Sequence, residues 1–360
     1  MKFLKVILFF LPAMVYYVVV EIRNFLFDIR ILPSKSFPVP VISVGNLTMG
    51  GTGKTPHTEY IAKLLIENNY SPVAILSRGY KRKTKGFIDV MEHHTYTEVG
   101  DEPFQFRQKF SKNDVVVCVD ASRKRGIKKI ISNYPDVKAI ILDDAFQHRY
   151  VNSGLNILLT DYYLPFFKNH IFPLGSLREP GASAKRADCV VITKSPVVIS
   201  PLMRKIIISK IPSLSNDNLY FSKIEYQEWK WINKSADFKE SEKYSGIFLF
   251  TGIVNPYPLI HYLKTKTNNY IPLYKFPDHY IFTKKELLKI IKDFKDHLSI
   301  NKIIVTTEKD ASRLSALSLK EIFSDVPICY VPINIKFHNS DSELFNQKIL
   351  NYVEKNQRNI

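Results

Sequence analysis

A glycine-rich turn ending in Gly53-Lys54-Thr55 follows the apolar residues 41–44. In such a turn the backbone N–H groups converge on phosphate oxygens, the lysine adds a positive charge, and the threonine hydroxyl is a ligand for Mg²⁺. The sequence therefore predicts a nucleotide phosphate site. We expect it to be formed by Thr48, Met49, Gly50, Gly51, Thr52, Gly53, Lys54 and Thr55.

One position of the turn departs from the usual pattern. The consensus G-x-x-x-x-G-K-[ST] has glycine where this chain has Thr48, and we expect Gly45, Gly50 and Gly51 to supply the flexibility instead. Pro56 then stands in the first turn of a predicted helix, whose N-terminus favours a bound phosphate. An incidental glycine-rich turn is the alternative, but the order of strand, turn and helix favours the phosphate site.

Two adjacent carboxylates, Asp143 and Asp144, end the apolar residues 139–142. An aspartate at the end of such a strand lies beside the metal ion in P-loop enzymes. Because neighbouring residues of a strand point to opposite faces, the two carboxylates are assigned different tasks. We predict that Asp143 binds the metal ion and that Asp144 handles a proton or supports the metal shell.

Three further residue groups carry chemistry that phosphate transfer needs. Asp101 precedes a proline and is either the N-cap of a helix or a general base on an incoming hydroxyl, and residue chemistry leaves both open. Arg178 is predicted to bind phosphate and Glu179 to complete the Mg²⁺ shell, with a surface ion pair as the alternative. His279 lies among aromatic residues and, taken alone, is most simply a structural histidine.

These side chains require a sheet that brings strand ends together. Short β-branched segments alternate with amphipathic ones, which predicts an α/β fold: a P-loop NTPase-like, mostly parallel sheet flanked by helices. Ligands of such sheets bind at the carboxyl ends of the strands, where Asp143 and Asp144 stand. The predicted strands are 39–44, 73–76, 115–119, 139–142, 156–160 and 189–193.

A second alternation of strands and helices predicts a smaller α/β domain. Its expected strands are 247–251, 270–274, 303–307 and 328–331. Polar residues and isolated aromatics between 212 and 245 are interpreted as a connection. The predicted division is an N-terminal helix at 1–28, a P-loop core at 29–220, and the C-terminal domain with its connecting segment at 221–360.

The amino terminus contains uncharged residues from Val6 to Val20, with Lys2 and Lys5 before them. A membrane-spanning helix needs about 20 apolar residues, so this segment is short for a span, and Pro12 lies in its middle. We predict a helix to about Phe27 that lies in or dips into the cytoplasmic leaflet, with its basic flanks on anionic headgroups. A signal peptide and a buried core helix are the alternatives.

Composition narrows the range of partners. The chain has 51 Lys+Arg against 34 Asp+Glu, a formal net charge of +17, which favours nucleic acid, acidic lipid or a phosphorylated substrate. No nucleic-acid recognition motif is evident, so nucleic acid is not expected. Cys118, Cys189 and Cys329 lie inside apolar segments and are predicted to be buried, without the spacing of a zinc site.

Taken together, the motifs closely resemble the tetraacyldisaccharide 4'-kinase family, the lipid A 4'-kinases. They follow one another from about residue 40 to 313: Gly45-Asn-Leu-Thr-Met-Gly-Gly-Thr-Gly-Lys-Thr-Pro56, Ser77-Arg-Gly-Tyr80, Val99-Gly-Asp-Glu-Pro103, Asp143-Asp-Ala-Phe-Gln-His148, Leu177-Arg-Glu-Pro180, Phe276-Pro-Asp-His-Tyr280 and Thr306-Thr-Glu-Lys-Asp310. The resemblance implies transfer of the γ-phosphate of ATP, with Mg²⁺, to the 4'-hydroxyl of a tetraacyldisaccharide 1-phosphate, giving lipid IVA. It also implies a location at the cytoplasmic face of the bacterial inner membrane, and no obligate protein partner is predicted.

The resemblance also implies roles for single residues. Asp101 would be the base, paired with His279, while Lys54 and Thr55 would hold the phosphates and Mg²⁺. The carboxylates listed above would surround the metal and the nucleophile, namely Asp143, Asp144 and Glu179. The chain departs from the family pattern at Ala145, where glycine is usual, and at Lys81-Arg82, where small residues are usual.

Two other classes of P-loop protein remain as alternatives. A membrane-surface ATPase acting as a switch or scaffold has a similar turn, but its signature lysine would fall at Met49. A regulatory GTPase needs an N-K-x-D motif to bind guanine, and Thr193-Lys-Ser-Pro196 matches it poorly.

Overall fold

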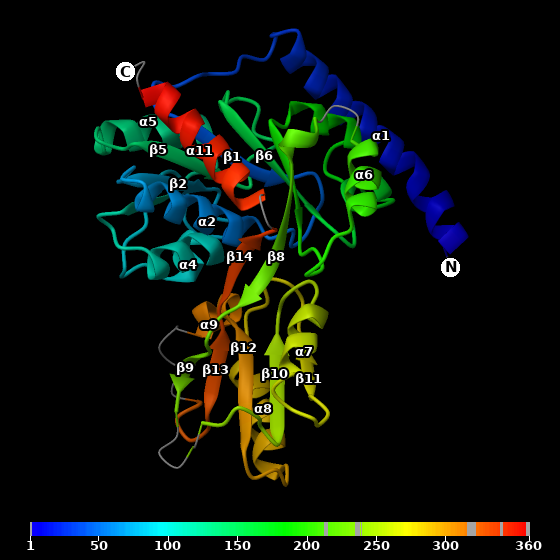
Figure 1. Cartoon of the computed structure of the whole chain (residues 1–360), viewed down its shortest axis with the longest axis vertical. Helices are drawn as coiled ribbons and strands as arrows, with labels where there is room; N and C mark the ends of the chain where they lie inside the picture. Colours follow the sequence, from blue (N-terminus) through cyan, green and yellow to red (C-terminus); the bar gives the residue numbers. More distant parts are fainter. Residues whose placement is uncertain are drawn as a thin grey trace. The chain divides into compact units, whose positions relative to one another are not determined.

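The computed structural model describes residues 2–211, 215–234, 238, 240–314, 322–338 and 341–357, with the side chains of 2–7 and 216 excepted. The basic flank predicted at Lys2 and Lys5 is therefore outside the described side chains, and parts of the predicted connection, at 212–214, 235–237 and 239, are outside the described residues. Two compact units make up the chain (Figure 1). Unit 1 comprises residues 1–92, 106–224 and 335–360, and unit 2 comprises 93–105 and 225–334.

Unit 1 is built on a nine-stranded sheet in the order β14-β8-β7-β6-β1-β5-β2-β4-β3. Its strands are β1 (Val41–Asn46), β2 (Val73–Ser77), β3 (Ile88–Asp89), β4 (Val115–Val119), β5 (Ala139–Asp143), β6 (Leu155–Asp161), β7 (Cys189–Thr193), β8 (Leu219–Tyr226) and β14 (Ile333–Phe337). From β8 to β4 each neighbouring pair is parallel, and β3 is antiparallel to β4. The predicted mostly parallel sheet is confirmed.

Burial explains why these segments form strands. Every residue of β1, β2, β4, β5 and β7 is buried, as expected for parallel strands covered on both faces. The helices of unit 1 are α1 (Lys2–Asp28), α2 (Lys54–Glu67), α4 (Asp101–Lys109), α5 (Arg123–Asn133), α6 (Pro201–Ser209) and α11 (Asp341–Gln357), of which α4 begins in unit 2. Ile127 and Ile130 of α5 pack on β2, β4 and β5, while Ile207 of α6 packs beside β6 and β7.

Unit 2 is a smaller α/β structure, as predicted. Its sheet has the order β11-β10-β12-β13-β9, with β9 antiparallel to β13 and the other pairs parallel. The strands are β9 (Lys230–Asn233), β10 (Gly246–Thr251), β11 (Leu273–Lys275), β12 (Lys302–Thr307) and β13 (Ile328–Val331), and the helices are α3 (Tyr96–Val99), α7 (Tyr257–Leu263), α8 (Lys284–Asp296) and α9 (Glu308–Leu314). Leu287, Ile290 and Phe294 of α8 fill one side of its core.

The units differ from the contiguous domains that we predicted. Residues 93–105 belong to unit 2, and residues 335–360 return to unit 1, because β14 pairs with β8 and α11 packs on α2. The segment 212–245 is also more than a connection, since it contains β8 and β9. Sequence reasoning missed β8 although its first residues are buried, and it placed the start of β11 too early.

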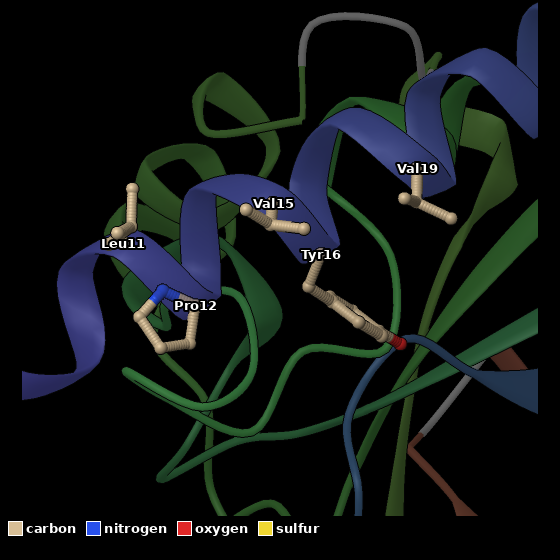
Figure 2. Close-up of a pocket in the computed structure, with 5 residues that line it drawn as sticks. All are labelled: Leu11, Pro12, Val15, Tyr16 and Val19. Atoms are coloured by element: carbon tan, nitrogen blue, oxygen red, sulfur yellow. The ribbon is translucent and has the colours of Figure 1, made fainter.

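Helix α1 extends from Lys2 to Asp28 with Pro12 inside it, close to the predicted end at Phe27. By length and composition it could cross a membrane, but length and composition are weak evidence. Its apolar residues are largely exposed, with Leu11 at 70% and Val19 at 60%, so the buried-core alternative is wrong. Figure 2 shows the apolar hollow beside the helix, lined by Leu11, Pro12, Val15, Tyr16 and Val19.

Candidate functional site

The glycine-rich turn joins β1 to α2 in the order strand, turn, helix. Gly50 and Gly53 have φ angles of 115° and 85°, a conformation that residues with a side chain rarely adopt. Asn46, at the end of β1, donates from its side-chain amide to Thr52 Oγ1 at 2.8 Å and to the Gly50 carbonyl at 3.4 Å. Asn46 thus shapes the turn, although sequence reasoning assigned it no role.

Gly45 serves close packing rather than flexibility, which corrects our expectation for it. A Cβ atom on Gly45 would lie 2.7 Å from both the backbone nitrogen and the Cβ of Phe146. Neither Gly45 nor Gly51 has a positive φ, so only Gly50 of the three acts as predicted. The glycine at 45 lets the segment that follows β5 approach β1.

Residues at the ends of β6 and β7 also fix the turn. Thr193 Oγ1 donates to the Thr52 carbonyl at 2.9 Å, and Lys194 Nζ donates to the Gly51 carbonyl. The same ammonium group binds Asp161 Oδ2 at 2.9 Å. The segment at Thr193, which matched a guanine-binding motif poorly, therefore supports the phosphate turn from the ends of β6 and β7.

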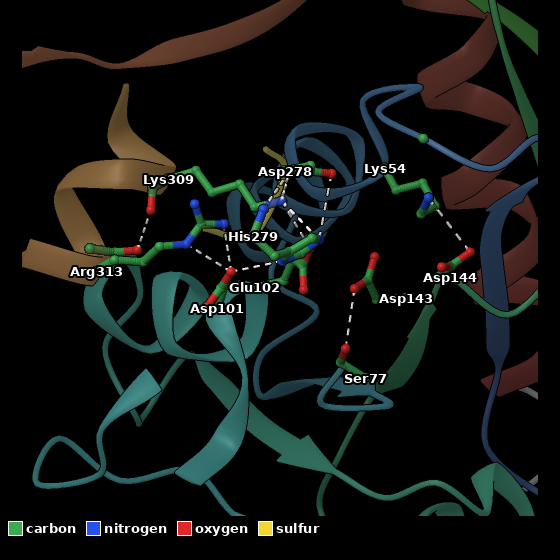
Figure 3. Close-up of polar contacts among 12 residues, drawn as sticks. Lys54, Ser77, Asp101, Glu102, Asp143, Asp144, Asp278, His279, Lys309 and Arg313 are labelled. Atoms are coloured by element: carbon green, nitrogen blue, oxygen red, sulfur yellow. Dashed lines mark hydrogen bonds and ion pairs between the residues drawn. The ribbon is translucent and has the colours of Figure 1, made fainter. Parts of the chain in front are cut away.

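Two cations meet the carboxylate of Asp144. Lys54 Nζ lies 3.6 Å from Asp144 Oδ1 (Figure 3). Arg178 Nη1 donates to both carboxylate oxygens at 2.9 and 3.0 Å. Burial by itself would raise the pKa of Asp144, but Lys54 and Arg178 outweigh it and lower that pKa. The structure thus brings together Lys54, Asp144 and Arg178, which were predicted separately.

Asp143 has different partners from its neighbour Asp144, as predicted, but for another reason: β5 ends at Asp143, and Asp144 follows it with a φ of 50° instead of occupying the opposite face of the strand. Asp143 is buried at the end of β5, where Oδ1 accepts from Thr58 Oγ1 at 3.4 Å. Oδ2 accepts from Ser77 Oγ at 3.3 Å (Figure 3). Arg123 is buried too and donates to the Asp143 carbonyl at 2.9 Å.

The oxygen donors at Asp143 fit a magnesium ion. Mg²⁺ usually takes one or two protein carboxylates and completes its shell with water and substrate phosphates. Within the described ranges, no cluster of three or more Asp, Glu, His or Cys residues is placed to hold a metal. The Asp143 carboxylate and the Thr55 hydroxyl, at the start of α2, suit a shell of that kind.

Glu179 is placed differently from its predicted role in the metal shell. Its side chain is 1% exposed, binds Arg186 Nη2, and lies 3.6 Å from Arg23 Nη1 of α1. The ion pair between Glu179 and Arg186 is therefore buried and does not lie on the surface, where the alternative placed it. None of its recorded contacts supports metal binding, which stays a prediction.

In unit 2, the carboxylate of Asp101 is held by the side chains of His279 and Arg313 (Figure 3). Asp101 Oδ2 accepts from His279 Nδ1 at 2.8 Å and from Arg313 Nε and Nη2 at 2.9 and 2.6 Å. Burial alone would raise the pKa of Asp101, but hydrogen bonds and charge from His279 and Arg313 lower it to about 2. Asp101 is the first residue of α4, and the carboxylate pairs with these side chains across unit 2.

The contact with Asp101 places a proton on Nδ1 of His279, because an ionised carboxylate can only accept a hydrogen bond. The second ring nitrogen, Nε2, lies 3.3 Å from Lys309 Nζ, 3.7 Å from Asp278 Oδ2 and 3.9 Å from Glu102 Oε1. Arg313 is 1% exposed and also binds Asp310 at 2.9 Å. Sequence reasoning missed Arg313, although the motif that ends at Asp310 lies next to it.

Comparisons with known proteins agree on one family. The family model described as Tetraacyldisaccharide-1-P 4'-kinase matches residues 5–354. Curated tetraacyldisaccharide 4'-kinases are similar: that of Bacteroides fragilis is 42% identical, covering 94% of this chain and 91% of the relative, and that of Flavobacterium psychrophilum is 41% identical over the full length of both. The crystal structure of LpxK from Aquifex aeolicus in complex with ATP is also similar, with a TM-score of 0.68, 27% identity, and coverage of 96% of this chain and 98% of that one.

Proposed function

Since this chain belongs to the tetraacyldisaccharide 4'-kinase family, we propose that its glycine-rich turn binds the phosphates of ATP and that Asp101 is the general base. The enzyme is a phosphotransferase of lipid A biosynthesis. It transfers the γ-phosphate of ATP to the 4'-hydroxyl of a tetraacyldisaccharide 1-phosphate and so forms lipid IVA, the 1,4'-bisphosphate.

The observation that carries the phosphate site is the meeting of Lys54 and Arg178 at Asp144 beside the glycine-rich turn. All three side chains are partly exposed, so a bound triphosphate can take over the two cations without opening a core. The positive Lys54 and Arg178 then stabilise negative charge that develops during transfer, which is the main contribution a kinase makes. Asp144 is released to support the metal shell or handle a proton.

Asp143 and Thr55 are the residues that would hold Mg²⁺, for which their oxygen donors are suited. When bound, the ion neutralises charge on the transferring phosphoryl group. The protein itself contributes the fixed position of Asp143, which Thr58 and Ser77 hold at the end of β5.

Asp101 accepts the proton of the sugar hydroxyl as the new O–P bond forms and the bond to ADP breaks. Its low pKa keeps the carboxylate ionised at neutral pH, and His279 donates to it from Nδ1. Arg313 prevents the carboxylate from turning away. A carboxylate held by two donors is a weak base, so its role suits a reaction in which the hydroxyl proton leaves late.

The acceptor is a lipid, and α1 offers a surface for reaching it. Leu11, Val15 and Val19 are exposed on a helix of 27 residues, and the formal net charge of the chain is +17. Such a helix lies at a bilayer surface, with basic residues on anionic headgroups. We therefore place the enzyme at the cytoplasmic face of the inner membrane, as a monotopic or peripheral protein.

A transfer assay tests this function. The enzyme is incubated with γ-labelled ATP and either the acylated disaccharide 1-phosphate or plain liposomes. Label in the disaccharide supports the kinase, whereas lipid-stimulated hydrolysis without labelled lipid supports the switch or scaffold ATPase. Both functions would be contradicted if the disaccharide stayed unlabelled and ATP was not hydrolysed in the presence of liposomes.

A further inference from the structure

Helix α1 has two faces with different surroundings. Ala13, Val20, Asn24 and Phe27 are buried and recur at helical spacing, so this face lies against unit 1. Another set of side chains on the same helix is exposed and apolar: Leu11, Met14, Val15, Val18, Ile22 and Phe25. The helix therefore covers protein on one side and offers an apolar surface on the other.

The covered face touches the segments that carry Arg178 and Gln147. Tyr16 donates its hydroxyl to the Arg178 carbonyl at 2.9 Å. Arg23 Nη2 donates to the Gln147 carbonyl at 2.8 Å, and its Nη1 lies 3.6 Å from Glu179. These contacts link α1 to residues more than a hundred positions away in the chain.

The same two segments hold the glycine-rich turn. Gln147 Nε2 donates to the Asn46 carbonyl at 2.8 Å. Residues 176–178 pair with the turn through an isolated antiparallel bridge between Leu177 and Thr48. The Arg178 backbone N–H donates to the Leu47 carbonyl at 2.7 Å, and the Met49 N–H donates to the Ser176 carbonyl at 2.6 Å. One intervening segment thus separates each contact on α1 from the phosphate turn.

We propose that α1 is a positioning element of the phosphate site, with Tyr16 and Arg23 as its positioning residues, and that a lipid bilayer on its exposed face strengthens nucleotide binding through them. The inference rests on the proposed nucleotide site. The outer face commits to lipid because its exposed side chains from Leu8 to Phe25 are apolar apart from Tyr17 and Glu21, and because the acceptor itself carries acyl chains. Coupling between two sites is reciprocal, so nucleotide also tightens the binding of the enzyme to vesicles.

Affinity for ADP tests the proposal without the acceptor. ADP binding to the full chain is measured by calorimetry in neutral detergent micelles and on vesicles of anionic phospholipid. Loss of a single hydrogen bond costs about 0.5–1.5 kcal/mol, so Tyr16→Phe is expected to weaken ADP binding roughly two- to tenfold. Arg23→Ala also removes the ion pair with Glu179 and is expected to weaken ADP binding at least as much. In the parent enzyme ADP affinity is expected to be higher on vesicles than in detergent micelles, and this difference should be smaller in the double variant Tyr16→Phe/Arg23→Ala.

Matched variants separate positioning from folding and from membrane anchoring. Tyr16→Phe keeps the ring that packs edge-on against Phe172 and removes only the hydroxyl. Tyr17→Phe removes the same group from the neighbouring residue, which is 39% exposed, and should bind ADP as the parent does. Both variants should sediment with vesicles as the parent does, because the outer apolar face is unchanged.

A kinetic split provides the second readout. Positioning of the turn predicts a higher KM for ATP in Tyr16→Phe with most of kcat recovered at saturating ATP, whereas simple destabilisation lowers the melting temperature without moving KM. The proposal would be overturned if Tyr16→Phe and Arg23→Ala both bound ADP as tightly as the parent. It would also be overturned if vesicles increased the ADP affinity of the double variant as much as that of the parent. Failure to label the lipid would instead contradict the proposed function, and the ADP measurement would be unaffected.

Discussion

Replacement of Asp101 by asparagine tests the assignment of the base and the electrostatics of unit 2 at the same time. The amide would keep the size of the side chain but would lose the charge that binds His279 and Arg313. The pKa of Asp101 falls from 3.8 to about 2 in the folded protein. A shift of this size corresponds to about 2.5 kcal/mol of stability, since one unit is about 1.4 kcal/mol.

The sign of the pH dependence follows from that lowered pKa. Between about pH 4 and pH 2 the Asp101 carboxylate is protonated in the unfolded chain but still ionised in the folded protein. Its contribution to the free energy of unfolding is therefore present near neutral pH and declines as the pH falls from about 4 toward 2. We therefore expect the free energy of unfolding of the parent enzyme to exceed that of Asp101→Asn by about 2 kcal/mol near pH 7. The difference should shrink below pH 4.

Tryptophan fluorescence during urea unfolding is the assay for stability. The chain has 2 tryptophans, Trp229 and Trp231, and both belong to unit 2, so the signal follows the unit that contains Asp101. Phosphate transfer to the lipid and ADP binding are measured beside it. Transfer should be lost, while ADP affinity, which depends on unit 1, should stay within about twofold, a change below 0.5 kcal/mol.

Asp296→Asn is the control for this experiment. It removes an exposed carboxylate from the end of α8 in unit 2, so neither transfer nor the unfolding curve should change appreciably. Normal transfer by Asp101→Asn would refute the base assignment. A stability difference that is the same at pH 3 and pH 7 would refute the argument from the lowered pKa.

Three other changes test unit 1. Lys54→Ala should lower transfer about a hundredfold or more in the labelled-lipid assay, because it removes charge stabilisation of the phosphates; normal transfer would contradict the phosphate site. Gly45→Ala should destabilise the protein by about 1–3 kcal/mol in thermal unfolding, since its Cβ meets the Phe146 backbone at 2.7 Å; an unchanged melting temperature would contradict that packing. Thr193→Val should raise the KM for ATP about three- to tenfold, because the Thr52 carbonyl loses its hydrogen bond; an unchanged KM would show that this bond does not shape the turn.

The parts of the fold that the sequence predicted are those set by local pattern. Continuous apolar segments predicted β4, β7 and β13 to the residue. Strands that are covered on both faces are apolar throughout their length, so both of their ends are visible in the sequence. The glycine-rich turn was equally visible, since its chemistry depends on neighbours in the chain. β8 was missed because its outer half is only partly buried and its sequence lies in a polar region.

The site residues that were missed or misjudged depend on contacts distant in sequence. Arg313 reaches Asp101 across 212 positions, and no local signal distinguishes it from other basic residues. Gly45 was expected to provide flexibility because the approach of Phe146 is invisible without the sheet. The pairing of Glu179 with Arg23 and Arg186 was also not visible in the sequence, because it requires α1 to cover the segment 176–186; its role in a metal shell stays a prediction.

Unit 1 and unit 2 both hold an aspartate between two cationic or donor side chains, yet exposure gives the two arrangements different uses. At Asp144 the partners Lys54 and Arg178 are 16% and 28% exposed, so a triphosphate can displace the carboxylate at small cost. At Asp101 the Arg313 side chain is 2% exposed, and breaking that pair would leave a buried charge without its partner. The first pair is therefore suited to exchange with a ligand. The second fixes a carboxylate that must keep its position and its charge while the acceptor hydroxyl reacts.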